Sequence, residues 1–202
     1  ENLDRLFAPR SVALIGASKK PSSVGAVLAR NLFRAGFDGP VMPVHPRHEA
    51  IEGVLAYTDV ASLPRTPELA VISTPPAAVP GLVAELAARG TSAAIIVTAG
   101  FAELPGRAGR DLQRKILSAT GRSGMRLVGP NTVGIQVPRL GLNASFAHLS
   151  ARTGSLAFVT QSGGVLTAVL DWADQRNIGF SHLVSLGGMA DVDFGDMLDY
   201  LA

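Results

Sequence analysis

Short apolar runs alternate with helical patterns over the first two thirds of the chain. Each apolar run is nearly continuous, as is typical of a strand buried on both faces. The pattern predicts strands at 11–15, 41–44, 69–73, 93–98 and 126–128, with helices at 23–35, 80–89 and 109–120. Such alternation predicts α/β architecture with a doubly wound, Rossmann-like parallel sheet.

The pattern changes after residue 129, where Gly, Pro, Asn and Ser become frequent and helical periodicity is lost. We interpret this stretch as a final strand followed by a linker over 139–153. A strand, a glycine turn and a helix then begin a second α/β unit, and a further strand and helix follow. Two strands do not bury their own faces, so this unit is either cut within a domain or leans on the first. The predicted domains are therefore 1–138 and 154–202, joined by that linker.

Composition excludes several classes of protein. Eighteen basic and sixteen acidic side chains among 202 residues give a net charge of +2, which is too weak to indicate nucleic-acid binding. The chain has no cysteine, and its four histidines lack metal-ligand spacing, so we expect neither disulfides nor a metal site. No apolar run is long enough to span a bilayer and no secretory pattern opens the sequence, so we expect a cytoplasmic protein.

The stretch "SVALIGASKKPSSVG" (11–25) is typical of a phosphate-binding loop. Gly16 allows a sharp turn after the strand, and the following helix directs free amides and its dipole at the loop, beside Ser18 and Lys19. The next glycine is Gly25, so the dinucleotide fingerprint G-x-G-x-x-G is absent. The alternative is an ordinary strand-to-helix turn with solvated lysines.

The second predicted strand ends in "PVHPRH", where an NAD-binding domain carries an acidic residue. The nearby acid, Asp38, precedes the strand, whereas Arg47 follows it. A guanidinium pairs with phosphate, so we expect a ligand with a phosphate on its ribose, which leaves NADP or coenzyme A (CoA). The missing fingerprint weakens NADP, and a surface arginine in a turn is the alternative for Arg47.

The other predicted strand ends carry small or flat residues, in "STPPAAVPG", "VTAGF" and "GPNTVG". Ligands of such sheets bind outside the carboxyl ends of the strands. A long thin ligand therefore fits this edge. Asn131 is either a polar contact for that ligand or a turn-forming residue after Pro130.

A second candidate anion site is "TQSGG", where Ser162, Gly163 and Gly164 stand between a strand and a helix. Thr160 replaces the first glycine of a G-x-S-x-G nucleophile elbow, so we prefer a phosphate cradle over a nucleophile. A plain capping turn is the alternative. His182 lies inside an apolar strand pattern and is interpreted as structural.

These motifs together resemble the ADP-forming acyl-CoA synthetases, relatives of the succinyl-CoA synthetase alpha subunit. The resemblance covers essentially the whole chain, from "LFAPRSVALIGAS" through "GFDGPVMPVHP", "GMRLVGPNTVG" and "FVTQSGGVLTAVLDWA" to "SLGGMADVDFGDMLDYLA". It implies a first domain that binds CoA and the start of a second, flavodoxin-like domain. The implied CoA-binding residues are Gly16, Ala17, Ser18, Lys19, Val24, Gly25, Val44, His45, Pro46, Arg47, Thr74, Pro75, Ala99, Gly100, Phe101 and Asn131.

Within that set, the resemblance gives three regions of CoA to three parts of the chain. The loop from Gly16 to Gly25 would wrap the diphosphate, and Arg47 would meet the ribose 3′-phosphate, where the family usually has lysine. The thiol would lie near Gly100, Phe101 and Asn131.

The family's reaction, as the resemblance implies it, interconverts acyl-CoA, ADP and phosphate with a carboxylic acid, CoA and ATP. Phosphate attacks acyl-CoA, a histidine takes the phosphoryl group from the acyl phosphate, and ADP receives it. Ser162, Gly163 and Gly164 would hold the phosphate. None of the four histidines matches the phosphohistidine motif, and the ATP-grasp domain that binds ATP or ADP with Mg²⁺ is absent. We therefore expect this chain alone to bind CoA without turnover, and the whole protein to be a homo- or hetero-oligomer.

Local departures from the family pattern are "PVHPR" for "PVNPK", "GPNTVG" for "GPNCLG" and "TQSGG" for "SQSGA". An alternative function is a non-catalytic CoA- or acyl-CoA-sensing module of a bacterial protein lysine acetyltransferase, in which a similar region is fused to an acetyltransferase. The sequence does not identify the acyl group.

Overall fold

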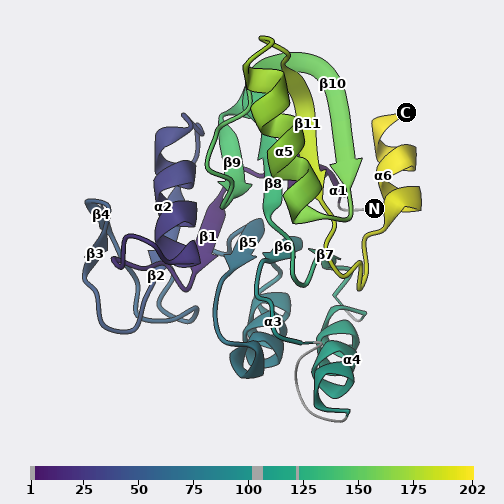
Figure 1. Cartoon of the computed structure of the whole chain (residues 1–202). Helices are drawn as coiled ribbons and strands as arrows, with labels where there is room; N and C mark the ends of the chain where they lie inside the picture. Colours follow the sequence, from purple (N-terminus) through teal and green to yellow (C-terminus); the bar gives the residue numbers. More distant parts are fainter. Residues whose placement is uncertain (1–2, 102–106, 122) are drawn as a thin grey trace.

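A computed structural model describes residues 3–101, 107–121 and 123–202. Five parallel strands form the first sheet in the order β2-β1-β5-β6-β7 (Figure 1). They are β1 (Val12–Ile15), β2 (Val41–Val44), β5 (Leu69–Ile72), β6 (Ala93–Ile96) and β7 (Arg126–Val128). The parallel sheet and its strands confirm the predicted fold class, with ends that differ by one or two residues.

Alternating side chains of these strands pack on helices on both faces of the sheet. Leu69 and Val71 join one core cluster with α1 (Leu3–Phe7) and α2 (Val24–Arg34). Ala70 and Ile72 join another with α3 (Val79–Ala88) and α4 (Ala108–Thr120), which lie together below the sheet in Figure 1. A strand covered on both faces has no polar side, which explains the unbroken apolar runs. Two short strands, β3 (Ala50–Ile51) and β4 (Val54–Leu55), follow β2. The 3₁₀ helix η1 (Pro76–Ala78) precedes α3.

The second sheet has four strands in the order β10-β11-β8-β9. Strands β10 and β11 are parallel, whereas β11, β8 and β9 pair antiparallel in that order. Its strands are β8 (Gly134–Val137), β9 (Leu142–Ser145), β10 (Thr153–Thr160) and β11 (Phe180–Ser185). The 3₁₀ helix η2 (Pro138–Leu140) and the helices α5 (Gly163–Asp174) and α6 (Phe194–Leu201) complete this unit. Among the helices of the described ranges, none is long and apolar enough to cross a membrane.

Residues 139–153, interpreted from sequence as a linker, contain strand β9, so that interpretation is corrected. Gln136 of β8 pairs with Asn143 of β9, and both side chains are buried. The Gln136 amide donates to Ser145 Oγ (3.2 Å), and Ser145 Oγ donates to Asn143 Oδ1 (2.6 Å). Because these polar side chains hydrogen-bond to one another, they can be buried. The hairpin is therefore buried although its sequence is as polar as that of a loop. The domain boundaries at 138 and 154 stay a prediction.

The second unit leans on the first, which was one of the two alternatives left by the sequence. One core cluster combines Leu14 of β1, Ile135 of β8, Val184 of β11 and Met197 of α6. In α2, Asn31 Nδ2 donates to the carbonyls of Ser145 (2.8 Å) and Ala147 beyond β9. Strands β10 and β11 are the two strands that could not bury their own faces. They are therefore covered by β8, β9 and the first unit.

Candidate functional site

The carboxyl ends of the five parallel strands are joined in a row by hydrogen bonds between their loops. With neighbouring strands about 4.8 Å apart, the row spans ~19 Å. The bonds across the sheet run from Gly16 N to Val44 O (3.2 Å), Ser73 N to Ile15 O (2.8 Å), Thr98 Oγ1 to Thr74 O (2.8 Å) and Asn131 N to Thr98 O (3.0 Å). Predicted site residues that are distant in sequence therefore lie along one edge.

The central cavity of this edge has a volume of about 610 Å³ and lies at the ends of β1, β2 and β5. It brings together most of the residues predicted for the first half of the ligand. They are Gly16, Ala17, Ser18, Val24, Gly25, His45, Pro46, Thr74 and Pro75, to which Ser23, Ser73 and Ala78 are added.

Two glycines allow the backbone beside this cavity to pack closely. Gly16 has φ +92°, and a Cβ there would collide with the carbonyl of Ser73. A Cβ on Gly25 would collide with the carbonyl of Gly16, so the start of α2 touches the loop backbone. Close packing of a helix N-terminus on a strand end is the arrangement that presents backbone amides to an anion.

Ser23 is the N-cap of α2, and its hydroxyl both accepts and donates a hydrogen bond within the chain. Its Oγ accepts from Ala26 N (3.3 Å) and donates to the carbonyl of Lys20 (2.8 Å). Within the described chain, no residue accepts from the amides of Val24 and Gly25, which remain for a ligand.

Thr74 lines the same cavity, and its hydroxyl oxygen is unusual among the described residues. Its Oγ1 is buried and has no hydrogen-bond partner in the part of the chain that the structure describes. A buried hydroxyl without a partner is costly.

At the end of β2, His45 organises the turn that carries Arg47. The Nδ1 atom of His45 accepts from the amides of Arg47 (3.1 Å) and His48 (3.2 Å), and its ring stacks on His48 at 4.1 Å. Burial, with the charges of His48 and Arg47, lowers the pKa of His45. The neutral ring that this favours is the form in which Nδ1 accepts.

Arg47 lies beside a neighbouring cavity of about 310 Å³, which shares His45 and Pro46 with the central one. Its side chain is exposed, and among the described residues its guanidinium makes no ion pair. The turn therefore presents an unpaired cation at the β2 end of the row.

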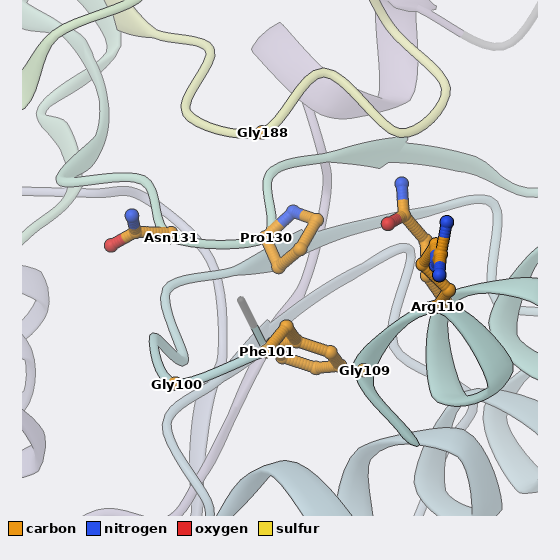
Figure 2. A pocket seen from close by; sticks show the side chains of 8 residues that line it. Gly100, Phe101, Gly109, Arg110, Pro130, Asn131 and Gly188 are labelled. Atoms are coloured by element: carbon orange, nitrogen blue, oxygen red, sulfur yellow. The ribbon is translucent and has the colours of Figure 1, made fainter. Parts of the chain in front are cut away.

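A third cavity, of about 260 Å³, lies at the ends of β6 and β7 (Figure 2). It brings together Gly100, Phe101 and Asn131, the three residues predicted for the thiol end. Asn131 has φ +56°, so it forms the turn, and its side chain is nevertheless exposed. The turn-forming role is thus confirmed, while the ligand contact stays a prediction. The sequence did not assign the remaining lining residues, Gly109, Arg110, Gln113, Pro130 and Gly188.

Three predicted residues do not line these cavities. Val44 is buried behind the end of β2, Lys19 is exposed in the loop after Gly16, and Ala99 is exposed next to Gly100. They flank the row and do not form its walls.

The "TQSGG" turn stands beside the β7 end of the row. Ser162 is the N-cap of α5, and its Oγ accepts from Val165 N (3.4 Å), so the capping alternative describes its observed contact. The phosphate role of Ser162, Gly163 and Gly164 stays a prediction. A Cβ on Gly163 would collide with Val133, so this turn packs against the loop after β7. The neighbouring Gly187, whose amide donates to the carbonyl of Gln161, lies close to the Asn131 carbonyl of the same loop.

His182 packs between aromatic rings, as expected of a structural residue. Its ring lies edge-on to Phe7 at 5.3 Å, and burial lowers its pKa. No group of three or more potential metal ligands occurs among the described residues.

The fold and the row of cavities define a ligand-binding protein built from two α/β units. Residues 10–138 match the family described as "CoA binding domain", so the chain belongs to that family. Residues 153–202 match the family described as "Succinyl-CoA ligase like flavodoxin domain". The row of strand ends is therefore the edge of a CoA-binding domain.

Relatives that resemble this chain include ADP-forming acetate–CoA ligases. It is 38% identical to the acetate–CoA ligase (ADP-forming) I of Archaeoglobus fulgidus, over 99% of the chain and 29% of that protein. It is also 38% identical to the acetate–CoA ligase (ADP-forming) II subunit alpha of Pyrococcus furiosus, over 99% of the chain and 43% of that subunit. The chain thus spans less than half the length of these relatives.

A solved structure has the same fold. The dinucleotide-forming acetyl-coenzyme A synthetase 1 of Candidatus Korarchaeum cryptofilum, in complex with phosphate and ADP, has a TM-score of 0.92 to this chain. The two are 36% identical over 100% of this chain and 43% of that one.

Proposed function

We propose that this chain is the CoA-binding portion of an ADP-forming acyl-CoA synthetase. The whole enzyme would interconvert acyl-CoA, ADP and phosphate with a carboxylic acid, CoA and ATP. The named relatives are ligases of this kind, and they give no support to the alternative of an acetyltransferase sensor.

One observation carries the proposal: three cavities follow one another along the carboxyl edge of the sheet. Arg47 lies at the β2 end and Asn131 at the β7 end, with the glycine loop and Thr74 between them. An elongated ligand with a phosphate at one end and a thiol at the other matches this order. NADP would need the same cation but also the G-x-G-x-x-G loop, which this chain lacks.

The residues present fit CoA along its length. The free amides of Val24 and Gly25 and the charge of Lys19 suit the diphosphate. Arg47 suits the ribose 3′-phosphate because a guanidinium forms paired hydrogen bonds with phosphate oxygens. Pro75, which precedes η1 and lines the central cavity, gives a rigid surface for the apolar parts.

The chemical step would take place where the loop after β7 meets the "TQSGG" turn. A phosphate oxygen attacks the acyl carbon, the carbon–sulfur bond breaks, and the sulfur leaves with the electron pair as the CoA thiolate. The first amides of α5, after Ser162, would hold the phosphate and stabilise its charge. Phosphohistidine formation and transfer to ADP would use residues outside this chain.

The proposal includes a partner for this chain. An ATP-grasp domain, in the same polypeptide or in a second subunit, would bind ADP or ATP with Mg²⁺; one similar protein is itself called a subunit alpha. A homo- or hetero-oligomeric enzyme in the cytoplasm remains part of the same proposal.

Isothermal titration of the chain with CoA, NADP and NAD tests the ligand. We expect CoA to bind, NADP to bind more weakly and NAD not to bind. Tighter binding of NADP than of CoA would overturn the proposal.

A further inference from the structure

The turn after β2 is anchored at both ends by backbone hydrogen bonds. It lies on the same side of the molecule as β3 and β4 (Figure 1). The amide of His45 donates to the carbonyl of Tyr57 (2.8 Å), and the carbonyl of Glu49 accepts from the amide of Ala56 (2.8 Å). The path of the chain is therefore fixed on either side of residues 46–48.

Between these anchors, one side-chain atom holds the turn. The Nδ1 atom of His45 accepts from the amides of Arg47 (3.1 Å) and His48 (3.2 Å). Neither amide donates to a backbone carbonyl of the described residues. A side-chain acceptor that bonds to the amide two positions later is a common way to hold a turn. The backbone of Arg47 therefore depends on the acceptor at His45.

His45 lies at the boundary between two cavities of the row. It lines the central cavity of about 610 Å³ together with Gly25 at the start of α2. It also lines the neighbouring cavity of about 310 Å³ together with Arg47. His45 thus stands between the proposed position of the CoA diphosphate and that of the ribose 3′-phosphate.

Arg47 needs such support to recognise one phosphate. Its side chain is exposed, and no ion pair orients its guanidinium in the part of the chain that the structure describes. Ordering a long side chain and its loop on binding reduces affinity, and a loop that is already held in its bound conformation reduces it less. A fixed turn leaves only the side chain of Arg47 to be ordered.

The ring of His45 makes a second contact, which is separable from the first. It stacks on the ring of His48, with 4.1 Å between the centroids and 23° between the planes. Phenylalanine at position 45 would keep a ring for stacking and lack the acceptor. Asparagine would keep an acceptor oxygen and lack the ring. The two substitutions therefore distinguish the hydrogen bonds from the stacking.

We propose that His45 is a positioning residue for the ribose 3′-phosphate of CoA. Its Nδ1 atom holds the turn in which Arg47 meets that phosphate, and it thereby sets the preference for CoA over 3′-dephospho-CoA. His45 acts through Arg47 and needs no contact of its own with the phosphate. This inference rests on the proposed function, because it takes Arg47 as the partner of the 3′-phosphate.

Isothermal titration with CoA and with 3′-dephospho-CoA at neutral pH tests the inference. In His45→Phe the preference for CoA should fall about threefold to tenfold, because a freed turn has to be ordered on binding. His45→Asn should keep the wild-type preference, because its side-chain oxygen accepts from the amide two positions later. The affinity for dephospho-CoA should be the same in the wild type and both variants.

His148→Asn is the matched control. His148 is an exposed histidine that pairs with Asp171 at 2.6 Å and does not line the row of cavities. This variant should keep the wild-type preference, and a shift as large as that in His45→Phe would overturn the inference.

Two further results would overturn the positioning role. Loss of the preference in His45→Asn with retention in His45→Phe would show that stacking on His48 holds the turn. Equal losses of affinity for CoA and dephospho-CoA in His45→Phe would show a role in the fold alone, because only the contact between Arg47 and the 3′-phosphate differs between the two ligands.

Titration of the wild type separates this inference from the function on which it rests. If the wild type binds CoA more tightly than dephospho-CoA and His45→Phe keeps that preference, the positioning role fails and the CoA site stands. If CoA does not bind to the wild type, the proposed function fails and the positioning role fails with it.

Discussion

The side chain of Arg126 in β7 is tied to Asp191, 65 positions later in the chain. Arg126 Nε lies 3.0 Å from Asp191 Oδ2, and the same carboxylate oxygen accepts from Leu127 N at 2.7 Å. Arg126 Nη2 reaches Asp196 of α6 at 2.9 Å. Burial would raise the pKa of Asp196, but hydrogen bonds from Arg126 and the Asp193 amide outweigh it and leave that pKa lowered. These bonds hold the segment after β11, including Gly188, against the edge of the first sheet.

Asp191→Asn should destabilise the chain, because it removes the charge opposite a half-buried guanidinium. A hydrogen bond to a charged group contributes about 1.5–3 kcal/mol, and we expect a loss of about 2 kcal/mol in urea unfolding. Arg152→Ala is the control, because Arg152 and Asp174 form an exposed pair at 3.0 Å, for which the loss should stay below about 1 kcal/mol. Equal losses in the two variants would show that the Arg126 bonds do not hold the units together.

His45 should make the stability of the chain depend on pH. Its pKa in the folded chain is lowered, below the ~6.5 of an unfolded histidine. Its contribution to stability is therefore fully present above about pH 6.5 and is lost as the pH falls through the lowered pKa. Protonation of Nδ1 also ends its role as acceptor for Arg47 and His48.

His45→Asn isolates this effect, because an amide oxygen takes the acceptor position of Nδ1 and does not titrate. Urea unfolding at pH 7.5 and pH 5 should show a smaller loss in this variant than in the wild type. The same loss in both proteins would mean that His45 does not govern the turn.

Ser162 should separate the two proposed anion sites. Ser162→Ala removes the cap of α5, at a cost of about 1 kcal/mol, and should leave CoA binding nearly unchanged. Acyl phosphate formation in the intact enzyme should fall sharply.

Ser162→Asp distinguishes capping from phosphate binding, because aspartate caps well and carries a negative charge. It should restore stability without restoring acyl phosphate formation. If activity returned with stability, Ser162 would be a cap and no more, and a large loss of CoA affinity in either variant would disprove the separation of the sites.

The sequence predicted the first sheet well because its strands are buried on both faces. Runs such as Leu69–Ile72 have no other plausible place than the middle of a parallel sheet. The hairpin of β8 and β9 was missed because Gln136, Asn143 and Ser145 are polar and yet buried, each bonded to another. Local patterns do not show such pairing in advance.

The candidate site was predicted in its parts and not in its arrangement. Gly16, Arg47 and Asn131 each follow a strand, and that much is visible in the sequence. Their order along the edge depends on the strand order β2-β1-β5-β6-β7, which differs from the order in the chain. Arg110 gave no local signal, because an arginine in a first helical turn resembles any solvated side chain.

The measurement that tests the central claim most directly compares CoA with 3′-dephospho-CoA in the wild type and in Arg47→Ala. If Arg47 pairs with the ribose 3′-phosphate, the variant should lose about ten- to a hundredfold in affinity for CoA, as a charge-assisted contact of 1.5–3 kcal/mol requires. Its affinity for dephospho-CoA should hardly change, and Arg34→Ala, which removes an arginine already paired with Glu52, should behave like the wild type. Equal losses for the two ligands in Arg47→Ala, or none for either, would contradict the orientation of CoA along this edge.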